Sequence, residues 1–301
     1  MTRTADLLRK VFVASRPISW PNTAFPFAAA YFLTAGVVDW KLVVGTLFFL
    51  IPYNAAMYGT NDVFDYESDL RNPRKGGVEG AVLDPSLHRP VLYLVWGSCV
   101  PFVIALVLGG GPWSWVVLAV SLFAVAAYRV AGLRFKEKPV LDSITSSTHF
   151  VSPALYGLVL AGWAPGGSAV VTPDHAAVGV SVLCAFFLWG MASHAFGAIQ
   201  DILPDRAAGI DSIGTLLGSR VTLGLVLVCY TAAGVVLLVT GGPARWTGLL
   251  AIPYLLNVAP YLGVRDETSE RTRPGWRRFL WLNYLTGFAV TLTMIGLSLG
   301  V

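Results

Sequence analysis

Charge is scarce in this chain. Only 13% of its 301 residues are Asp, Glu, Lys or Arg, about half the share found in ordinary soluble domains. A soluble protein of this length has too much surface to leave so little of it charged. Hydrophobic residues make up 55% of the sequence, and the mean hydropathy is +0.65. These values argue against a soluble enzyme and against a disordered protein.

Cysteine is also rare. The three cysteines, Cys99, Cys184 and Cys229, each fall within an apolar run, and their spacing matches no metal-binding motif. An odd number of isolated cysteines predicts neither a disulfide framework nor a zinc site. We therefore expect all three to be inert packing residues.

A continuous basic stripe is missing, although the pI is about 9.0. The lysines and arginines instead occupy short segments between long apolar runs. A nucleic-acid-binding protein would gather them on one surface, so the arrangement argues against a nucleic-acid partner. Short basic segments between apolar runs are typical of a protein that crosses the lipid bilayer several times.

A helix that spans the bilayer needs about 20 apolar residues. The sequence predicts nine such segments, and therefore an all-α fold. We expect a polytopic membrane bundle of nine transmembrane helices, with helical cap loops on the cytoplasmic side, in a single domain covering residues 1–301. The predicted spans are 17–37, 41–60, 88–109, 112–131, 140–162, 175–199, 218–240, 245–264 and 277–300.

The basic residues also predict how the bundle is oriented. With these spans, 19 of the 21 lysines and arginines fall on one side, and only Lys41 and Arg245 fall on the other. Cytoplasmic loops carry an excess of Lys and Arg, so the N-terminus and the loops after even-numbered spans are predicted to be cytoplasmic and the C-terminus outside. The basic N-terminus precedes no small-residue cleavage site, so we expect a retained first helix in a multi-pass protein of the cell membrane.

An acidic cluster follows the second predicted span, between Asn61 and Asp69. Asp62, Asp65 and Asp69 are three and four residues apart, which places them on one face of a helix that continues through them. Three like charges on one face repel each other, and a divalent cation bound by oxygen ligands would relieve this repulsion. Mg²⁺ takes one or two carboxylates together with the phosphate oxygens of a substrate, so we predict a Mg²⁺ site here.

A second acidic cluster follows the sixth predicted span, where Asp201 and Asp205 are four residues apart. Both clusters lie on the predicted cytoplasmic side, and two facing clusters can hold Mg²⁺ ions around one diphosphate. The alternative is that each cluster is a solvated helix end with incidental acids. The matched position of two clusters favours the metal site.

Cationic side chains suited to a diphosphate follow the first cluster and the fourth span. Arginine clamps phosphate oxygens with a fork of donors, and lysine adds a point charge. The same residues can also serve only as topology signals, and this alternative stays open for both groups. For the first group, the phosphate role and the topology role are evenly balanced. The candidates are Arg71, Arg74 and Lys75 after the first cluster, and Tyr128, Arg134 and Lys136 after the fourth span.

The paired motifs resemble those of the UbiA-type intramembrane prenyltransferases. They read Asn61-Asp62-x-x-Asp65-x-x-x-Asp69 and Asp201-x-x-x-Asp205, and the segment 128–136 is similar to the family's third signature. The resemblance implies a nine-helix bundle with a cytoplasmic cap, where two Mg²⁺ ions bind an isoprenyl diphosphate. The implied metal-binding and catalytic residues are Asp62, Asp65, Asp69, Asp201 and Asp205; Asn61 would assist, and Tyr128, Arg134 and Lys136 would hold the diphosphate.

Within this superfamily, segments 61–77, 133–143 and 194–201 resemble the lycopene elongases of C50 carotenoid synthesis. This resemblance implies transfer of a dimethylallyl group from dimethylallyl diphosphate to lycopene. One departure follows Tyr128, where the family usually has small residues and prolines and this chain has Arg129-Val130-Ala131-Gly132. The phosphate clusters cannot distinguish acceptors, so a quinone precursor, a chlorophyllide, haem or a glycerol lipid stay as alternatives.

In the implied reaction, a double bond of the acceptor attacks an allylic cation, and the new cation loses a proton or captures water. Asp142, His149 and His194 are candidates for quenching this cation, although hydrogen bonding within the bundle is the commoner use of such residues. A cation-coupled transporter is the alternative from another class, because acids in membrane segments also mark ion pathways. A transporter would carry acids near mid-span and an inverted repeat, whereas these acids lie at span ends.

Overall fold

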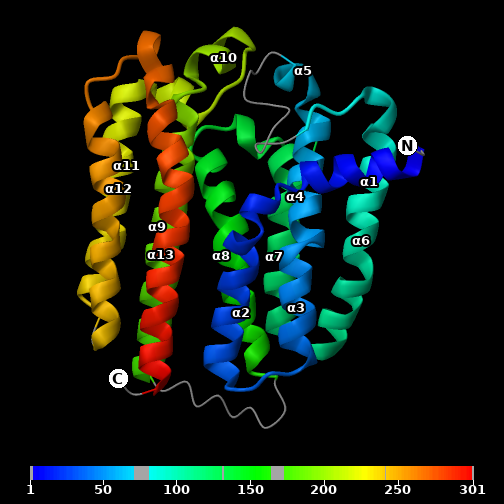
Figure 1. Cartoon of the computed structure of the whole chain (residues 1–301), viewed down its shortest axis with the longest axis vertical. Coiled ribbons are helices and arrows are strands. Elements are labelled where there is room, and N and C mark those ends of the chain that lie inside the picture. The colour runs from blue at the N-terminus through cyan, green and yellow to red at the C-terminus, as the bar shows by residue number, and fades with distance from the viewer. Residues whose placement is uncertain (1–2, 71–80, 131, 164–172, 241, 300–301) are drawn as a thin grey trace. The chain divides into compact units, whose positions relative to one another are not determined.

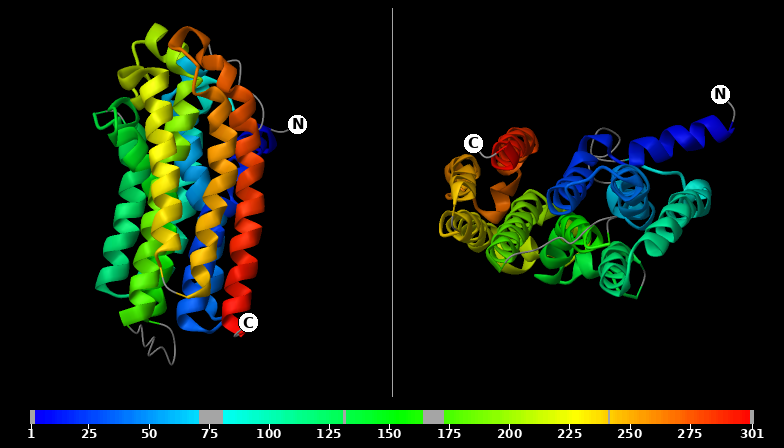
Figure 2. Two further views of the ribbon diagram at one scale, coloured as in Figure 1. Left: turned by 90° about the vertical axis from the view of Figure 1, so that its left-hand side faces the viewer. Right: turned by 90° about the horizontal axis from the view of Figure 1, so that it is seen from below.

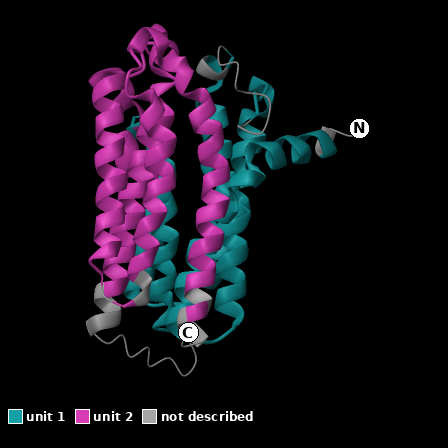
Figure 3. Cartoon of the chain, turned by 60° about the vertical axis from the view of Figure 1, so that its left-hand side comes forward, with its two compact units in different colours: residues 1–135, 149–170 teal, residues 136–148, 171–301 magenta. Residues whose placement is uncertain are grey.

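The computed structural model describes residues 3–70, 81–130, 132–163, 173–240 and 242–299. Within these residues the chain is helical and contains no strand, which confirms the all-α prediction (Figures 1 and 2). The chain divides into two compact units (Figure 3). Unit 1 comprises residues 1–135 and 149–170, and unit 2 comprises residues 136–148 and 171–301. The single domain over residues 1–301 stays a prediction.

Five helical segments of the described chain are long and apolar enough to cross a membrane. They correspond to the second, third, fourth, sixth and seventh predicted spans. The full count of nine spans, and the loop topology that depends on it, stay predictions. The five segments are Trp40–Phe64, Pro85–Gly109, Pro112–Arg129, Val178–Ile199 and Ile213–Leu238.

Unit 1 contains the helices of the first half of the chain together with most of α8. The helix α8 begins in unit 2 and continues into unit 1 after residue 148. The elements are α1 (Arg3–Ala14), η1 (Pro17–Ser19), α2 (Pro21–Ala35), α3 (Trp40–Leu50), α4 (Pro52–Phe64), α5 (Tyr66–Asp69), η2 (Pro85–Leu87), α6 (His88–Gly109), α7 (Pro112–Arg129) and α8 (Leu141–Ala161).

A break divides the second predicted span into α3 and α4. Pro52 begins α4 and has no backbone N–H, so a carbonyl in the preceding turn loses its usual donor. The side-chain amide of the buried Asn54 bonds two other carbonyl oxygens of this turn, because its Nδ2 donates to those of Phe49 at 2.7 Å and Leu50 at 3.1 Å. Asn54 therefore supplies donors to backbone carbonyls at the break between the two helices, where the membrane offers none.

Aromatic rings fill the core of unit 1 around Phe27 of α2. The ring centroid of Phe27 lies 5.2 Å from that of Phe49 in α3 and 5.9 Å from that of Tyr156 in α8. Gly157 allows α8 to approach this close, since a Cβ there would lie 2.5 Å from the carbonyl oxygen of Phe27. The helices α2, α3 and α8 therefore pack closely together in unit 1.

Unit 2 contains the helices of the second half of the chain. Its α11 packs against α9 and α12, and α12 packs against α13. The stacked rings of Tyr230 and Tyr254, 5.1 Å apart, join α11 to α12 in the core. The elements are η3 (Phe135–Glu137), which straddles the boundary, α9 (Pro173–Ile199), α10 (Ile202–Ala207), α11 (Ile213–Leu238), η4 (Pro243–Leu250), α12 (Ala251–Val258), η5 (Ala259–Tyr261), η6 (Asp266–Thr272) and α13 (Arg273–Leu299).

Two expectations for this half of the chain need adjustment. The eighth predicted span, 245–264, is divided among η4, α12 and η5. Pro253 and Pro260 lie within it, and neither has a backbone N–H to continue a regular α-helix. Among the cysteines, Cys99 and Cys229 are buried as expected, whereas Cys184 is exposed.

Candidate functional site

The first acidic cluster lies where α4 ends in unit 1. The helix stops one residue before Asp65, whose backbone N–H bonds the carbonyl oxygen of Asn61 at 2.9 Å. Asp65 itself adopts φ −98° and ψ 7°, outside the helical region, and the short helix α5 follows. Asp62 and Asp65 therefore share the end of α4, whereas Asp69 ends α5 and its side chain lies outside the described residues. The single continuous helix expected from the spacing is interrupted at Asp65.

Asp62 is fully buried, and both of its carboxylate oxygens are engaged. Oδ1 lies 3.2 Å from Nη2 of Arg16, and Oδ2 accepts the backbone N–H of Ala81 at 2.8 Å. The guanidinium of Arg16 also lies over the ring of Tyr58, 4.4 Å from its centroid. Asp62 thus ties the segments before α2 and before η2 to the end of α4. In the sequence, Arg16 counted only as a topology signal, and nothing there identified it as a partner of Asp62.

Arg129, the last residue of α7, forms an ion pair with Asp65. Its guanidinium also lies over the ring of Tyr128, 4.7 Å from the centroid. Asp65 keeps 6% of its side chain exposed and Arg129 keeps 13%, so solvent screens this pair only weakly. In the sequence, Arg129 was only a departure from the family pattern. The structure places Arg129 beside the acidic cluster. In the sequence, the charge directly after Tyr128 was the signal that could have identified this residue.

Two buried amide oxygens beside the acidic clusters accept no hydrogen bond from any described residue. They are Oδ1 of Asn61 in unit 1 and Oε1 of Gln200 in unit 2, each directly before the first aspartate of its cluster. A buried acceptor without a partner costs about 1–3 kcal/mol, so each oxygen is suited to a cation that binds there. Amide and carboxylate oxygens are ligands that Mg²⁺ takes, and the donor set therefore fits this ion.

The carboxylates themselves do not form a closed metal site in the part of the chain that the structure describes. No group of three or more His, Cys, Asp or Glu side chains gathers there around a common point. The first cluster belongs to unit 1, whereas Asp201 and Asp205 belong to unit 2. That the two clusters face each other and share one diphosphate therefore stays a prediction.

The second acidic cluster surrounds the short helix α10. Asp201 precedes this helix, and its carbonyl oxygen accepts the backbone N–H of Asp205 at 2.8 Å. The carboxylate of Asp205 accepts the hydroxyl of Ser212 at 3.4 Å. Both aspartates are half-buried. The four-residue spacing forms one helical turn, as the sequence predicted.

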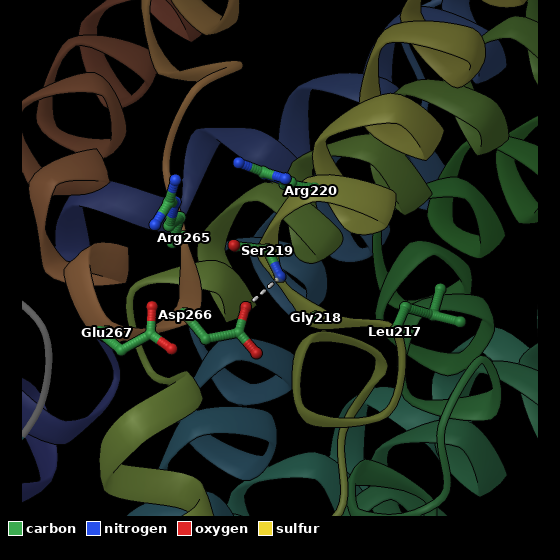
Figure 4. Close-up of a pocket in the computed structure, with 7 residues that line it drawn as sticks. All are labelled: Leu217, Gly218, Ser219, Arg220, Arg265, Asp266 and Glu267. Carbon is green, nitrogen blue, oxygen red and sulfur yellow. Dashed lines mark hydrogen bonds between the residues drawn. The ribbon is translucent and has the colours of Figure 1, made fainter.

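Asp266, the first residue of η6, connects α10 to α11. Its Oδ1 accepts the backbone N–H of Ser219 at 2.7 Å (Figure 4), and its Oδ2 lies 2.7 Å from Nη2 of Arg206. Gly218 interrupts α11 with a φ of 72°, which frees the N–H of Ser219 from the helix. The backbone hydrogen bond from Ser219 and the Arg206 guanidinium hold the pKa of Asp266 below its usual range. The helix that carries Asp205 is anchored in this way.

An open cavity of about 370 Å³ lies beside this anchor (Figure 4). Arg220 and Arg265 are exposed at its edge. None of the predicted site residues lines it. The lining residues are Leu217, Gly218, Ser219, Arg220, Arg265, Asp266 and Glu267.

The predicted diphosphate-binding residues lie in several places. Tyr128 lies in the last turn of α7, and its ring centroid is 5.2 Å from that of His149. Arg134 is half-buried in unit 1 with a φ of 39°, and Lys136 lies in η3 and belongs to unit 2. The roles of all these residues stay predictions. Arg71, Arg74 and Lys75 lie outside the described residues.

Comparisons with known proteins identify relatives over almost the whole chain. Residues 23–285 match the model of the UbiA prenyltransferase family. The chain is 46% identical over 292 residues to a lycopene elongase/hydratase from Corynebacterium glutamicum, covering 97% of this chain and 98% of that protein. It is 53% identical over 289 residues to the C(50) beta-cyclic carotenoids biosynthesis protein LbtBC of Dietzia sp. (strain CQ4). That match covers 96% of this chain but only 65% of the Dietzia protein.

Solved structures share the fold at low sequence identity. A UbiA homolog from Archaeoglobus fulgidus, bound to DMAPP and Mg²⁺, has a TM-score of 0.62 and 18% identity, covering 93% of this chain and 98% of that one. The apo structure of a UbiA homolog from Aeropyrum pernix K1 has a TM-score of 0.66 and 17% identity, covering 92% and 98%. With its long apolar helices, the protein is an integral membrane protein. The chain belongs to the UbiA prenyltransferase family and is a prenyltransferase.

Proposed function

We propose that this prenyltransferase transfers a dimethylallyl group from dimethylallyl diphosphate to lycopene, on the route to C45 and C50 carotenoids. The structural observation that supports a metal-dependent transfer is the buried, oxygen-rich end of α4. Asn61 there has an amide oxygen that accepts no hydrogen bond from any described residue, and the buried Asp65 follows four residues later. The full-length likeness to a lycopene elongase/hydratase supports lycopene as the acceptor. The chain spans only part of the Dietzia relative, which therefore supports the carotenoid class alone.

The proposed metal ligands come from both acidic clusters. Bound Mg²⁺ would neutralise the diphosphate and stabilise it as a leaving group. Asp65 and Asn61 offer oxygens at the end of α4, and Asp69 follows on α5. Both carboxylate oxygens of Asp62 already accept a donor, one from Arg16 and one from the backbone, so its contacts favour a role in fixing the end of α4. The remaining proposed ligands are Asp201 and Asp205.

Arg129 is the residue that the structure adds to this proposal. Its guanidinium neutralises Asp65 in the absence of ligand. When Mg²⁺ and a diphosphate occupy the site, the guanidinium would turn from the carboxylate to the phosphate oxygens, which it binds in the same forked geometry. The other proposed diphosphate-binding residues are Tyr128, Arg134, Lys136, Arg71 and Lys75.

The membrane setting determines what happens after the allylic C–O bond breaks. An apolar chamber keeps water from the cation until the acceptor double bond attacks. A hydrocarbon acceptor has no acidic proton to remove first, so no strong base is needed to activate it. We place the N-terminus and both acidic clusters on the cytoplasmic side of the cell membrane and the C-terminus outside, from the distribution of Lys and Arg.

Expression in a host that makes lycopene and dimethylallyl diphosphate tests this proposal. We expect wild-type protein to convert lycopene into C45 and C50 products, identified by chromatography and mass spectrometry of the pigments. Asp201→Asn should insert into the membrane at a similar level and leave lycopene unchanged. Unchanged lycopene with inserted wild-type protein would point to another acceptor, such as a quinone precursor, a chlorophyllide, haem or a glycerol lipid. The family match already overturns the transporter alternative.

A further inference from the structure

A buried carboxylate brings three elements of unit 2 together. Asp142, the second residue of α8, is fully buried. Its Oδ1 accepts the backbone N–H of Ser143 at 2.6 Å, and its Oδ2 accepts the backbone N–H of Ile213, which opens α11, at 2.8 Å. The same Oδ2 lies 3.4 Å from Nε2 of His194 on α9. A carboxylate held at so many points cannot rotate, so it fixes the imidazole ring in one orientation.

Packing does not account for the contact between Asp142 and His194. The approach of α8 to α9 is already made five residues further along α8, where the hydroxyl of Ser147 donates to the carbonyl oxygen of Phe187 at 2.7 Å. Gly190 allows this approach, since a Cβ there would lie 3.0 Å from the Cβ of Ser147. An apolar side chain at position 194 would serve the same helix contact. An imidazole held by a buried carboxylate instead matches the arrangement that enzymes use to accept a proton.

His194 lies near the end of α9 that leads to the second acidic cluster. The helix ends at Ile199, five residues after His194, and Asp201 follows in the turn before α10. Five residues of helix rise about 7.5 Å. The carbon chain of a diphosphate bound at Asp201 would extend along this part of α9. The side chain of His194 keeps 19% of its surface exposed, whereas that of Asp142 has none, so solvent reaches the imidazole but not the carboxylate.

We propose that His194 accepts the proton released when the carbocation of the prenyl transfer is quenched, and that Asp142 is the residue that positions it. This inference rests on the proposed function. The Nε2–H of a neutral imidazole would face Asp142, which makes Nδ1 the basic nitrogen. The buried carboxylate then stabilises the positive charge that the ring acquires.

The step balances for both possible products. The double bond of the acceptor forms a carbon–carbon bond to the allylic carbon as the bond to the diphosphate oxygen breaks, and the diphosphate leaves with that electron pair. The tertiary cation on the acceptor then loses a proton from a neighbouring carbon to give an alkene. Alternatively, water adds to the cation and releases a proton to give an alcohol. Each route delivers one proton to Nδ1 of His194.

His194→Gln in the full-length enzyme tests this role. Glutamine retains a donor for Asp142 but cannot accept a proton, so a purely structural contact would survive the change. We expect kcat to fall about 100-fold, while KM for dimethylallyl diphosphate stays within about 2-fold of wild type. Imidazole added to His194→Ala should raise the activity of this variant at least about 10-fold. This gain is smaller than the full rate contribution of a positioned general base. His88→Gln, at the start of α6, is the matched control and should retain wild-type kcat.

Asp142→Asn should lower kcat in the same way, and the double variant with His194→Gln should lose little more, because the two residues act as one unit. The unfolding temperature of each purified variant shows whether it has folded. Wild-type rates in His194→Gln, a rise in KM without a fall in kcat, or no rescue by imidazole would each overturn the inference. A wild-type enzyme that elongates no lycopene would overturn the proposed function instead, so the two failures are distinguishable.

Discussion

Arg129 at the end of α7 pairs with Asp65 at the end of α4, across 64 residues of sequence and largely away from solvent. Removing one partner of a buried ion pair destabilises a protein by about 3–5 kcal/mol. Arg129→Gln should therefore lower the unfolding temperature of the purified enzyme in detergent. Because Mg²⁺ would replace the lost cation at Asp65, added Mg²⁺ should raise the unfolding temperature of this variant more than that of wild type. Equal Mg²⁺ responses would contradict a metal site at Asp65.

Asp62→Asn and Asp65→Asn should separate positioning from metal binding. Both changes should abolish prenyl transfer, the first by releasing Arg16 and the second by removing a metal ligand. Mn²⁺ serves as a spectroscopic substitute for Mg²⁺, and its binding can be followed by electron paramagnetic resonance without substrate. We expect Mn²⁺ binding to weaken far more in Asp65→Asn than in Asp62→Asn. The reverse order would favour Asp62 as the stronger metal ligand; the sequence predicted both aspartates in this role.

Gly157→Ala should destabilise unit 1. The added Cβ would lie 2.5 Å from the carbonyl oxygen of Phe27 and 3.0 Å from the backbone nitrogen of Tyr31, and these backbone atoms cannot move aside. Overpacking of this kind costs about 1–3 kcal/mol. Gly224→Ala is the control, because nothing lies within 4 Å of its Cβ position and alanine favours the helix by up to about 1 kcal/mol. Equal unfolding temperatures in the two variants would contradict the close approach of α2 and α8.

Asp266 should make stability depend on pH at the acid end. Its pKa is lowered in the folded protein, so its contacts stabilise the fold at pH values above the unfolded-state pKa of about 3.9. This contribution is lost as the pH falls through the folded-state pKa. Asp266→Asn should therefore unfold at a lower temperature than wild type at pH 7, and the difference should shrink below about pH 4. The neighbouring exposed Glu267→Gln is the control; a difference that persists unchanged at pH 3 would count against this role.

Hydropathy predicted the helices well because membrane helices must hide their own backbone polar groups, which requires long apolar runs. Where those runs break depends on local chemistry that hydropathy does not record. At the break before Pro52, Asn54 donates to backbone carbonyl oxygens of the preceding turn, and the end of α4 at Asp65 depends on backbone angles rather than on residue spacing. The spacing of Asp62 and Asp65 therefore predicted the right cluster but not the shape of the helix end.

The partners of the acidic side chains were not predictable from the sequence. Arg16 meets Asp62 across 46 residues, and Arg129 meets Asp65 across 64. Any of the arginines on the predicted cytoplasmic side could satisfy the same topology rule, so only the packed structure shows which arginine pairs with which carboxylate. The arrangement of the two clusters around a shared diphosphate depends on the two units together and stays a prediction.

The backbone at Arg16 has a consequence for engineering. Its φ of 51° and ψ of 72° fall in the left-handed region, which costs a residue with a side chain about 1–2 kcal/mol. Glycine or asparagine would relax that strain, but either would leave the buried Asp62 without its guanidinium partner, and such a loss costs about 3–5 kcal/mol. The ion pair therefore outweighs the strained backbone. A library built to raise heat resistance should leave position 16 unchanged, although backbone angles alone would recommend replacing it.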